Sequence, residues 1–152
     1  MRIALAALVA AAVPAVAFAL PAVDRGTATI TTRSGARVVL QVEIVRTRAE
    51  RQQGLMGRRS LAAKAGMVFV YPSDVTGGFW MKNTLIPLDI AFYDARGRIL
   101  RTLTMVPCRR DPCRIYAPGV AYRAALEVNA GSFRRWNVRV GDRIAVRVTR
   151  AG

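Results

Sequence analysis

Apolar and polar residues alternate with a period of two over several short stretches, a pattern typical of β-strands buried on one face. The clearest stretch is 37–45, whose apolar side chains fall on one side: Val38, Leu40, Val42 and Ile44. A β-branched run over 27–32 precedes it, and the turn-forming residues of 33–36 separate the two. This arrangement predicts a β-hairpin.

Other apolar runs, each bounded by turn-forming residues, predict strands at 67–71, 79–81, 88–93, 98–106, 122–128 and 143–148. Thr47-Arg-Ala-Glu50 is a capping box and Gly54 suits a helix end, so a short helix is predicted between them. Ser132 is predicted to cap a second helical turn that runs through Trp136. We therefore expect a mostly β (β-rich α+β) protein: a single compact β-sandwich or barrel-like domain with one or two short helices.

The N-terminal segment has the three parts of a secretory signal. Arg2 supplies a positive charge, the stretch 3–18 is uncharged and rich in Ala and Val, and Ala17-Phe18-Ala19 fits the cleavage pattern. We expect cleavage after Ala19 and a periplasmic or secreted protein. Because the apolar run extends to Val23 and approaches the length of a bilayer span, an N-terminal membrane anchor is the alternative.

The predicted organisation is a signal peptide at 1–19, a linker at 20–26 and one domain at 27–150, which is a usual length for a single domain. No second apolar run is long and charge-free enough for a membrane helix. The mature domain is therefore not expected to span a membrane, and we expect it to be a monomer.

Two cysteines, Cys108 and Cys113, bracket the polar, turn-forming residues of 109–112. An oxidising compartment favours a local disulfide between them. The alternative is a redox or metal pair. The spacing is wider than a redox Cys-x-x-Cys, and no histidine is present to complete a zinc site, so the disulfide is the better interpretation.

The chain is strongly basic, with 24 Lys and Arg against 9 Asp and Glu and a formal net charge of +15. This charge suggests nucleic acid as a partner. The arginines, however, are scattered through almost every segment, without a basic run interleaved with aromatic residues, and export would separate the protein from intracellular DNA and RNA. We expect no nucleic-acid binding, and a basic surface that favours anionic partners.

The absence of histidine limits the chemistry most firmly. It excludes Ser-His and Cys-His catalysis and every histidine-ligated metal site. Gly77-Gly78 before a strand reads as a turn, because the phosphate-binding loop that would make it a nucleotide site is missing. No metal and no cofactor is expected.

Asp89 and Glu127 form the best carboxylate pair, since alternation along each predicted strand places the carboxylate on the face opposite the apolar residues. Two carboxylates on rigid strands can act as the acid and base of glycoside cleavage, which makes this pair the candidate catalytic group of a hydrolase. The alternative is that each is an ordinary strand residue or the partner of one of the many arginines.

A second group of candidates follows the strand at 79–81: Trp80, Lys82, Asn83 and Thr84. An exposed Trp80 offers a flat apolar platform for a sugar or a planar ring, and the neighbouring amide and hydroxyl supply directional hydrogen bonds. Arg51 can bind an acidic group in a two-pronged fork. The alternative is that Trp80 belongs to the core and that Asn83-Thr84 only makes a turn.

Taken together, these motifs resemble the "domain of unknown function 192" family, a group of small, often exported prokaryotic proteins. The resemblance spans about residues 28–148 and rests on these segments: Glu50-Arg51-x-x-Gly54-Leu55-Met56-x-Arg58, Gly66-Met67-x-Phe69, Phe79-Trp80-Met81-Lys82-Asn83-Thr84-x-x-Pro87-Leu88-Asp89, Leu126-Glu127-x-x-x-Gly131 and Gly141-Asp142. It implies a compact, mostly β domain with a small helical part, and no established reaction. The Cys108–Cys113 loop is a local departure from the motif set.

The leading hypothesis is an exported binding module for a small polar or anionic ligand or an envelope glycan. Its cleft would contain these ligand-binding candidates: Trp80, Lys82, Asn83, Thr84, Asp89, Arg51 and Glu127. Two alternatives remain open. One is a hydrolase that uses Asp89 and Glu127, and the other is an envelope interaction protein in which Trp80 and Asn83 are both buried.

Overall fold

The computed structural model describes residues 23–149, so the predicted signal peptide and residues 20–22 of the predicted linker lie outside the described residues. The elements in chain order are β1 (Asp24–Thr31), β2 (Arg37–Val45), α1 (Arg48–Gln53), β3 (Ala65–Val75), β4 (Phe79–Trp80), β5 (Leu88–Tyr93), β6 (Ile99–Met105), β7 (Ile115–Tyr116), β8 (Tyr122–Asn129), α2 (Ser132–Arg135) and β9 (Arg143–Val148). The fold is β-rich with two short helices, as the sequence predicted.

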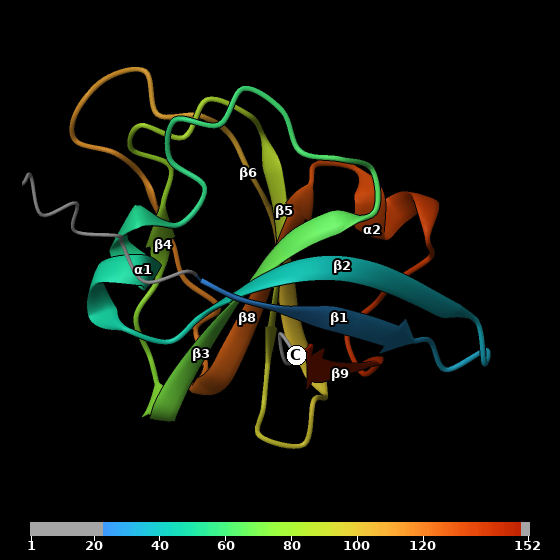
Figure 1. Ribbon diagram of the computed structural model, residues 1–152. Helices are drawn as coiled ribbons and strands as arrows, with labels where there is room; N and C mark the ends of the chain where they lie inside the picture. The colour runs from blue at the N-terminus through green and yellow to red at the C-terminus, as the bar shows by residue number, and fades with distance from the viewer. Residues whose placement is uncertain (1–22, 150–152) are drawn as a thin grey trace, which may run out of the picture.

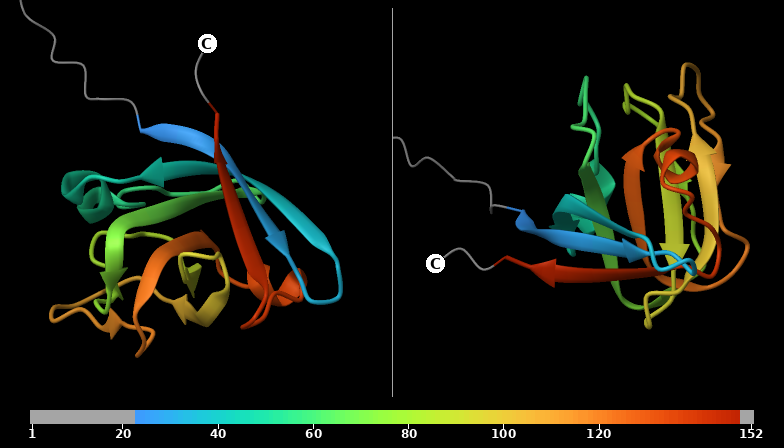
Figure 2. Two further views of the ribbon diagram at one scale, coloured as in Figure 1. Left: turned by 90° about the horizontal axis from the view of Figure 1, so that it is seen from below. Right: turned by 90° about the vertical axis from the view of Figure 1, so that its right-hand side faces the viewer.

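Seven of the strands form one strongly curled sheet in the order β6-β5-β8-β3-β2-β1-β9 (Figure 2). All neighbouring pairs are antiparallel except β2 and β3, which are parallel. Between them, α1 and the loop after it carry the chain back along β2, so that Ala65 at the start of β3 lies beside Gln41. The remaining strands, β4 and β7, pair with each other as a separate two-stranded sheet. In Figure 1, α1 and β4 lie at one end of the molecule and α2 lies at the other.

The two edges of the curled sheet meet, which gives the barrel-like closure. The Ile99 amide donates to the Asp142 carbonyl at 2.8 Å, and the Ile144 amide donates to the Gly97 carbonyl at 2.8 Å. These bonds join the start of β6 to the start of β9. Closure satisfies edge groups that would otherwise be open to pairing with another chain.

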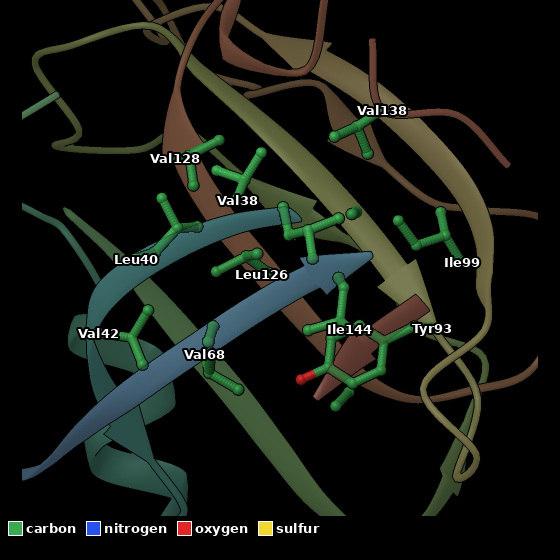
Figure 3. Packing of buried hydrophobic residues seen from close by; sticks show 14 of the residues in the cluster. Val38, Leu40, Val42, Val68, Tyr93, Ile99, Leu126, Val128, Val138 and Ile144 are labelled. Atoms are coloured by element: carbon green, nitrogen blue, oxygen red, sulfur yellow. The ribbon is translucent and has the colours of Figure 1, made fainter. Parts of the chain in front are cut away.

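Two apolar cores lie on opposite faces of the sheet. The barrel core fills the inside, where side chains from β2, β3, β8 and β9 point toward one another (Figure 3). Its members include Val38, Leu40, Val42, Val68, Tyr93, Ile99, Leu126, Val128, Val138 and Ile144. The outer core lies between the other face of the sheet and the layer made by α1, β4, β7 and their loops. It consists of Val45, Leu55, Met67, Phe69, Met81, Leu88, Ile90, Phe92, Met105, Tyr116, Tyr122 and Ala125.

The central strands are consequently buried on both faces, and all six residues of β5 are buried. A polar side chain on such a strand has no access to bulk water on either side. It must therefore find a partner inside the protein or face a cavity. This requirement applies to Asp89 on β5 and Glu127 on β8.

The hairpin and the capping box were predicted correctly. β1 and β2 pair over their whole length, and the side chains predicted to share a face are buried. The Glu50 amide donates to the Thr47 hydroxyl at 3.2 Å, and the Thr47 amide donates to the Glu50 carboxylate at 2.9 Å.

Several elements differ from the sequence prediction, including β3, which runs over Ala65–Val75 instead of 67–71. β1 begins at Asp24, so the end of the predicted linker at 24–26 belongs to the sheet. Gly26 lies inside β1 and marks no linker there. Glycine is required at this position because an added Cβ would lie 2.1 Å from the Arg147 carbonyl oxygen of the neighbouring strand. Gly131 rather than Ser132 occupies the cap of α2, and Ser132 is its first helical residue. β7 follows the cysteine loop, where no strand was predicted, because its two residues pair only with β4.

Within residues 23–149 no helix has the length and apolar character that crossing a membrane requires.

Candidate functional site

A cavity of about 540 Å³ opens between α1, the second half of β3, β4 and β8. Other hollows of similar size exist, including one of about 550 Å³ beside Asp89. The first cavity differs in its chemistry, because Arg51, Trp80, Thr84 and Glu127 all line it. These four residues come from three segments far apart in the chain, since Trp80 and Thr84 share one, and all four were predicted to bind ligand.

Glu127 is the most unusual group in this cavity. It is opposite Met67 of β3 and Ile90 of β5, which places its side chain on the outer-core face between two buried apolar neighbours. Only 4% of the residue is exposed, and no hydrogen bond or ion pair within residues 23–149 reaches its carboxyl group. Its oxygens are nonetheless not sealed, since the cavity reaches them.

Burial disfavours the charged form of a carboxyl group that has no compensating partner. Desolvation alone raises the pKa of Glu127 from 4.5 to about 8. The side chain is therefore mostly a neutral carboxylic acid at pH 7. In that form it offers an O–H donor to anything that occupies the cavity.

Arg51 supplies a fixed positive charge to the same cavity. One guanidinium nitrogen donates to the Arg46 carbonyl and, at 3.0 Å, to the Val70 carbonyl, while the guanidinium carbon lies 4.6 Å from the centre of the Tyr71 ring. No carboxylate lies within ion-pair distance of Arg51 in the described part of the chain. Its remaining N–H groups can thus donate hydrogen bonds to an external anion from a preorganised position.

The aromatic wall is built from β3 and β4. Phe79 packs edge-on against Phe69 at 4.9 Å and against Phe92 at 5.7 Å, which anchors β4 to the sheet. The next residue on β4, Trp80, is 49% exposed at the edge of the cavity. A half-exposed indole on an anchored strand provides the flat apolar surface expected of a sugar or ring platform.

Tyr71 also lines the cavity, and sequence reasoning missed it. Burial raises the pKa of Tyr71, the Tyr122 side chain and the Arg51 charge lower it, and the Glu127 charge raises it. The signal was present, because alternation along β3 puts Tyr71 on the same face as Phe69. It was hidden because the sequence does not reveal which face of β3 carries a cavity.

Lys82 and Asn83 lie outside the cavity, although both were ligand-binding candidates. Lys82 forms an ion pair of 3.0 Å with Asp111 of the cysteine loop. Asn83 is exposed with a φ of 56°, and its carbonyl accepts from the Gly57 amide at 2.9 Å, so it serves the turn. Asn tolerates this left-handed backbone better than most residues, which explains its place there.

Asp89 lies on the opposite face of the sheet from Glu127, because it is opposite Val128 on β8 rather than Glu127. Asp89 is 3% exposed and accepts from the Thr104 hydroxyl at 2.7 Å and from the Phe133 amide at 3.1 Å. It holds α2 against the sheet. The hypothesis of a carboxylate pair acting on one substrate is therefore wrong: the strand register sends the two side chains to opposite faces.

The alternative of an envelope interaction protein without a small-molecule site required Trp80 and Asn83 to be buried. Both are exposed.

The predicted disulfide is present between Cys108 and Cys113. Within residues 23–149, the group of side chains close enough to share a metal ion consists of these two cysteines and Asp111. The two sulfurs are bonded to each other, so neither is available as a thiolate ligand. The loop touches the site indirectly, through the Lys82–Asp111 ion pair and through Ile115 of β7, which lines the cavity.

Replacing both cysteines, as in Cys108→Ser with Cys113→Ser, is expected to lower the free energy of unfolding by about 2 kcal/mol, since the closed loop is short. Urea denaturation of the two proteins would measure this difference. Reduction of the native protein with dithiothreitol should produce the same loss. Equal stability with and without the disulfide would contradict the prediction.

Comparison with known proteins agrees with the sequence resemblance. The model of the domain of unknown function 192 family, described as "Uncharacterized ACR", matches residues 29–146. No curated protein matches the chain. A solved structure from Sinorhizobium meliloti 1021, described as "a putative transcription regulator", is 32% identical with a TM-score of 0.79, covering 84% of this chain and 98% of its own.

A second solved structure, of a protein of unknown function from Novosphingobium aromaticivorans DSM 12444, is also 32% identical. Its TM-score is 0.74, and the match covers 90% of this chain and 99% of the other. The family match extends from β1 into β9 and so includes every residue of the cavity. The chain belongs to the domain of unknown function 192 family.

Proposed function

We propose that the protein is an exported or periplasmic binding module whose cavity holds a small acidic ligand, such as an acidic sugar or a fragment of an envelope glycan. The observation that carries the proposal is Glu127, a buried carboxyl group without a protein partner that faces a cavity. Buried polar groups are otherwise almost always hydrogen-bonded, either within the protein or to ordered water. A ligand that fills the cavity would supply the missing hydrogen bond.

The other cavity groups support the acidic character of this ligand. Arg51 and Arg48 both line the cavity, and Glu127 is mostly neutral near pH 7, so the charge there is positive. Trp80 provides the platform against which a sugar ring would stack. Export is supported by the signal-like N-terminal sequence together with the disulfide, which forms and persists in oxidising compartments.

Isothermal titration calorimetry of the protein with acidic sugars would test the proposal. Arg51→Gln should weaken binding by about tenfold to a hundredfold, because a hydrogen bond to a charged group contributes about 1.5–3 kcal/mol. Trp80→Ala should weaken it by about tenfold through loss of the stacking surface. Arg147→Gln is the matched control: it removes one positive charge from an exposed position of β9 outside the cavity.

Equal losses for Arg51→Gln and Arg147→Gln would mean that only the overall basic charge attracts the ligand. If Trp80→Ala binds the ligand as tightly as the native protein, then the indole does not contact the ligand. Either result would overturn the assignment of this cavity.

A further inference from the structure

The ionisation state of Glu127 restricts what the cavity can hold. A carboxylate only accepts hydrogen bonds, whereas a carboxylic acid also donates one. Glu127 has apolar neighbours in the sheet on both sides, Met67 and Ile90, and nothing within residues 23–149 donates to it. Its state in the complex therefore depends on the ligand.

We infer that Glu127 takes part in the complex as a neutral carboxylic acid that donates a hydrogen bond to an acceptor oxygen of an acidic sugar, so that binding requires the protonated side chain. This inference rests on the proposed function and deepens it. It specifies the ligand as an anion with an acceptor oxygen next to the Glu127 carboxyl group, and it predicts that binding is coupled to pH.

The charged and titratable groups around Glu127 favour an anion over a cation. α1 contributes Arg48 and Arg51, β3 contributes Tyr71, and β8 contributes Tyr122, whose ring lies edge-on to that of Tyr71 at 5.7 Å. β4 and β5 contribute only apolar or aromatic side chains to this face, Phe79, Trp80, Ile90 and Phe92. An amine ligand would be repelled by the two arginines, and an anion held by them would oppose ionisation of Glu127.

Few other side chains can confuse the measurement. The chain has no histidine and both cysteines are in the disulfide, so the side-chain types that ordinarily titrate between pH 6 and 9 are missing. Burial raises the pKa of Glu127 to about 8, within this window. The carboxylate of an acidic sugar stays ionised throughout it.

The experiment is calorimetric titration between pH 5.5 and pH 9 with N-acetylmuramic acid and galacturonic acid as probes. N-acetylglucosamine and galactose, which lack the carboxylate, are the matched neutral probes. For the native protein the Kd for the acidic probes should be flat below about pH 7 and should rise about tenfold from pH 7 to pH 9, as the donor is lost. The neutral probes should bind more weakly at every pH.

Two variants separate protonation from shape. Glu127→Gln keeps a donor that does not titrate, so its Kd should no longer depend on pH. Glu127→Leu removes the donor, and it should bind the acidic probes at least tenfold more weakly than native protein at pH 5.5, again without pH dependence. Titration of the Glu127 carboxyl by ¹³C NMR, without ligand and with a saturating acidic probe, should show a pKa that the probe raises.

The outcomes distinguish the inference from the proposed function. Binding that is unaffected by pH, or a Kd that falls as pH rises, would overturn the inference while leaving a binding module. A carboxyl that titrates near 4.5 would do the same. Absence of binding by both acidic probes at pH 5.5 would overturn the proposed function and the inference with it.

Discussion

Replacing Glu127 by glutamine is expected to make the protein markedly more stable at alkaline pH. Glutamine has nearly the same shape and never ionises, so it removes the cost of a buried negative charge. We expect Glu127→Gln to be within about 1 kcal/mol of native protein at pH 5 and several kcal/mol more stable at pH 9. Urea denaturation at pH 5, 7 and 9 would measure the difference in free energy of unfolding.

The direction follows from the two pKa values of Glu127. The folded-state pKa is about 8 and the unfolded value is 4.5, so the folded protein holds a proton that the unfolded chain has lost between these pH values. The free energy of unfolding therefore falls as pH rises from about 4.5 to about 8. At about 1.4 kcal/mol per pH unit, the full loss is at most about 5 kcal/mol.

Glu43→Gln is the matched control, and its effect has the opposite sign. Arg58 donates two hydrogen bonds to the Glu43 carboxylate, at 2.7 Å and 2.6 Å, and these bonds lower the pKa of Glu43. Its contribution is therefore present above the unfolded pKa and is lost as pH falls. Glu43→Gln should weaken the protein at neutral pH. If the native protein and Glu127→Gln lose stability in parallel from pH 5 to pH 9, then Glu127 is ionised in the native protein.

The second large effect is expected at Gly97, where alanine should lower the free energy of unfolding by about 3 kcal/mol. Gly97 has a φ of 79°, a conformation that costs an alanine about 1 kcal/mol. An added Cβ would also lie 2.2 Å from the Ile144 carbonyl oxygen. Relieving that contact requires the backbone to move and disturbs the bond from the Ile144 amide to the Gly97 carbonyl, which joins the sheet edges.

Gly35→Ala separates the two causes. Gly35 has a φ of 87°, but nothing lies within 4 Å of an added Cβ, so this variant should lose only the conformational part, about 1 kcal/mol. Thermal and urea denaturation of both variants would show the difference. Equal losses for Gly97→Ala and Gly35→Ala would mean that the edge-to-edge contact adds nothing to stability.

The local elements of this protein could be predicted because their signals are short-range. Alternation in 37–45, the capping box at Thr47 and the turn at 33–36 each depend on residues within one strand or one turn. The cysteine pair was equally local. β7 was missed because a two-residue strand has no pattern of its own and forms only where β4 lies beside it.

The candidate site was predicted only in part, and the error about the two carboxylates has one cause. Alternation indicated that Asp89 and Glu127 each differ in direction from their apolar neighbours, but not that both faces of their strands would be buried. Once two cores form, Asp89 is satisfied by Thr104 and the start of α2 while Glu127 is not. That difference depends on the pairing of β5 with β8 and on the layer placed over them.

Composition and short-range pattern were enough to predict a β-rich domain with a cysteine bridge and to exclude histidine chemistry. They also indicated the segment around Trp80 as the place to look for a binding site. Long-range packing determined that Arg51, Tyr71, Trp80 and Glu127 meet at one cavity and that Asp89 does not join them. The physical reason is that alternation sets the direction of a side chain only relative to its own strand. What lies on that side is set by residues that are distant in the chain, and so is the protonation state of a buried carboxyl group.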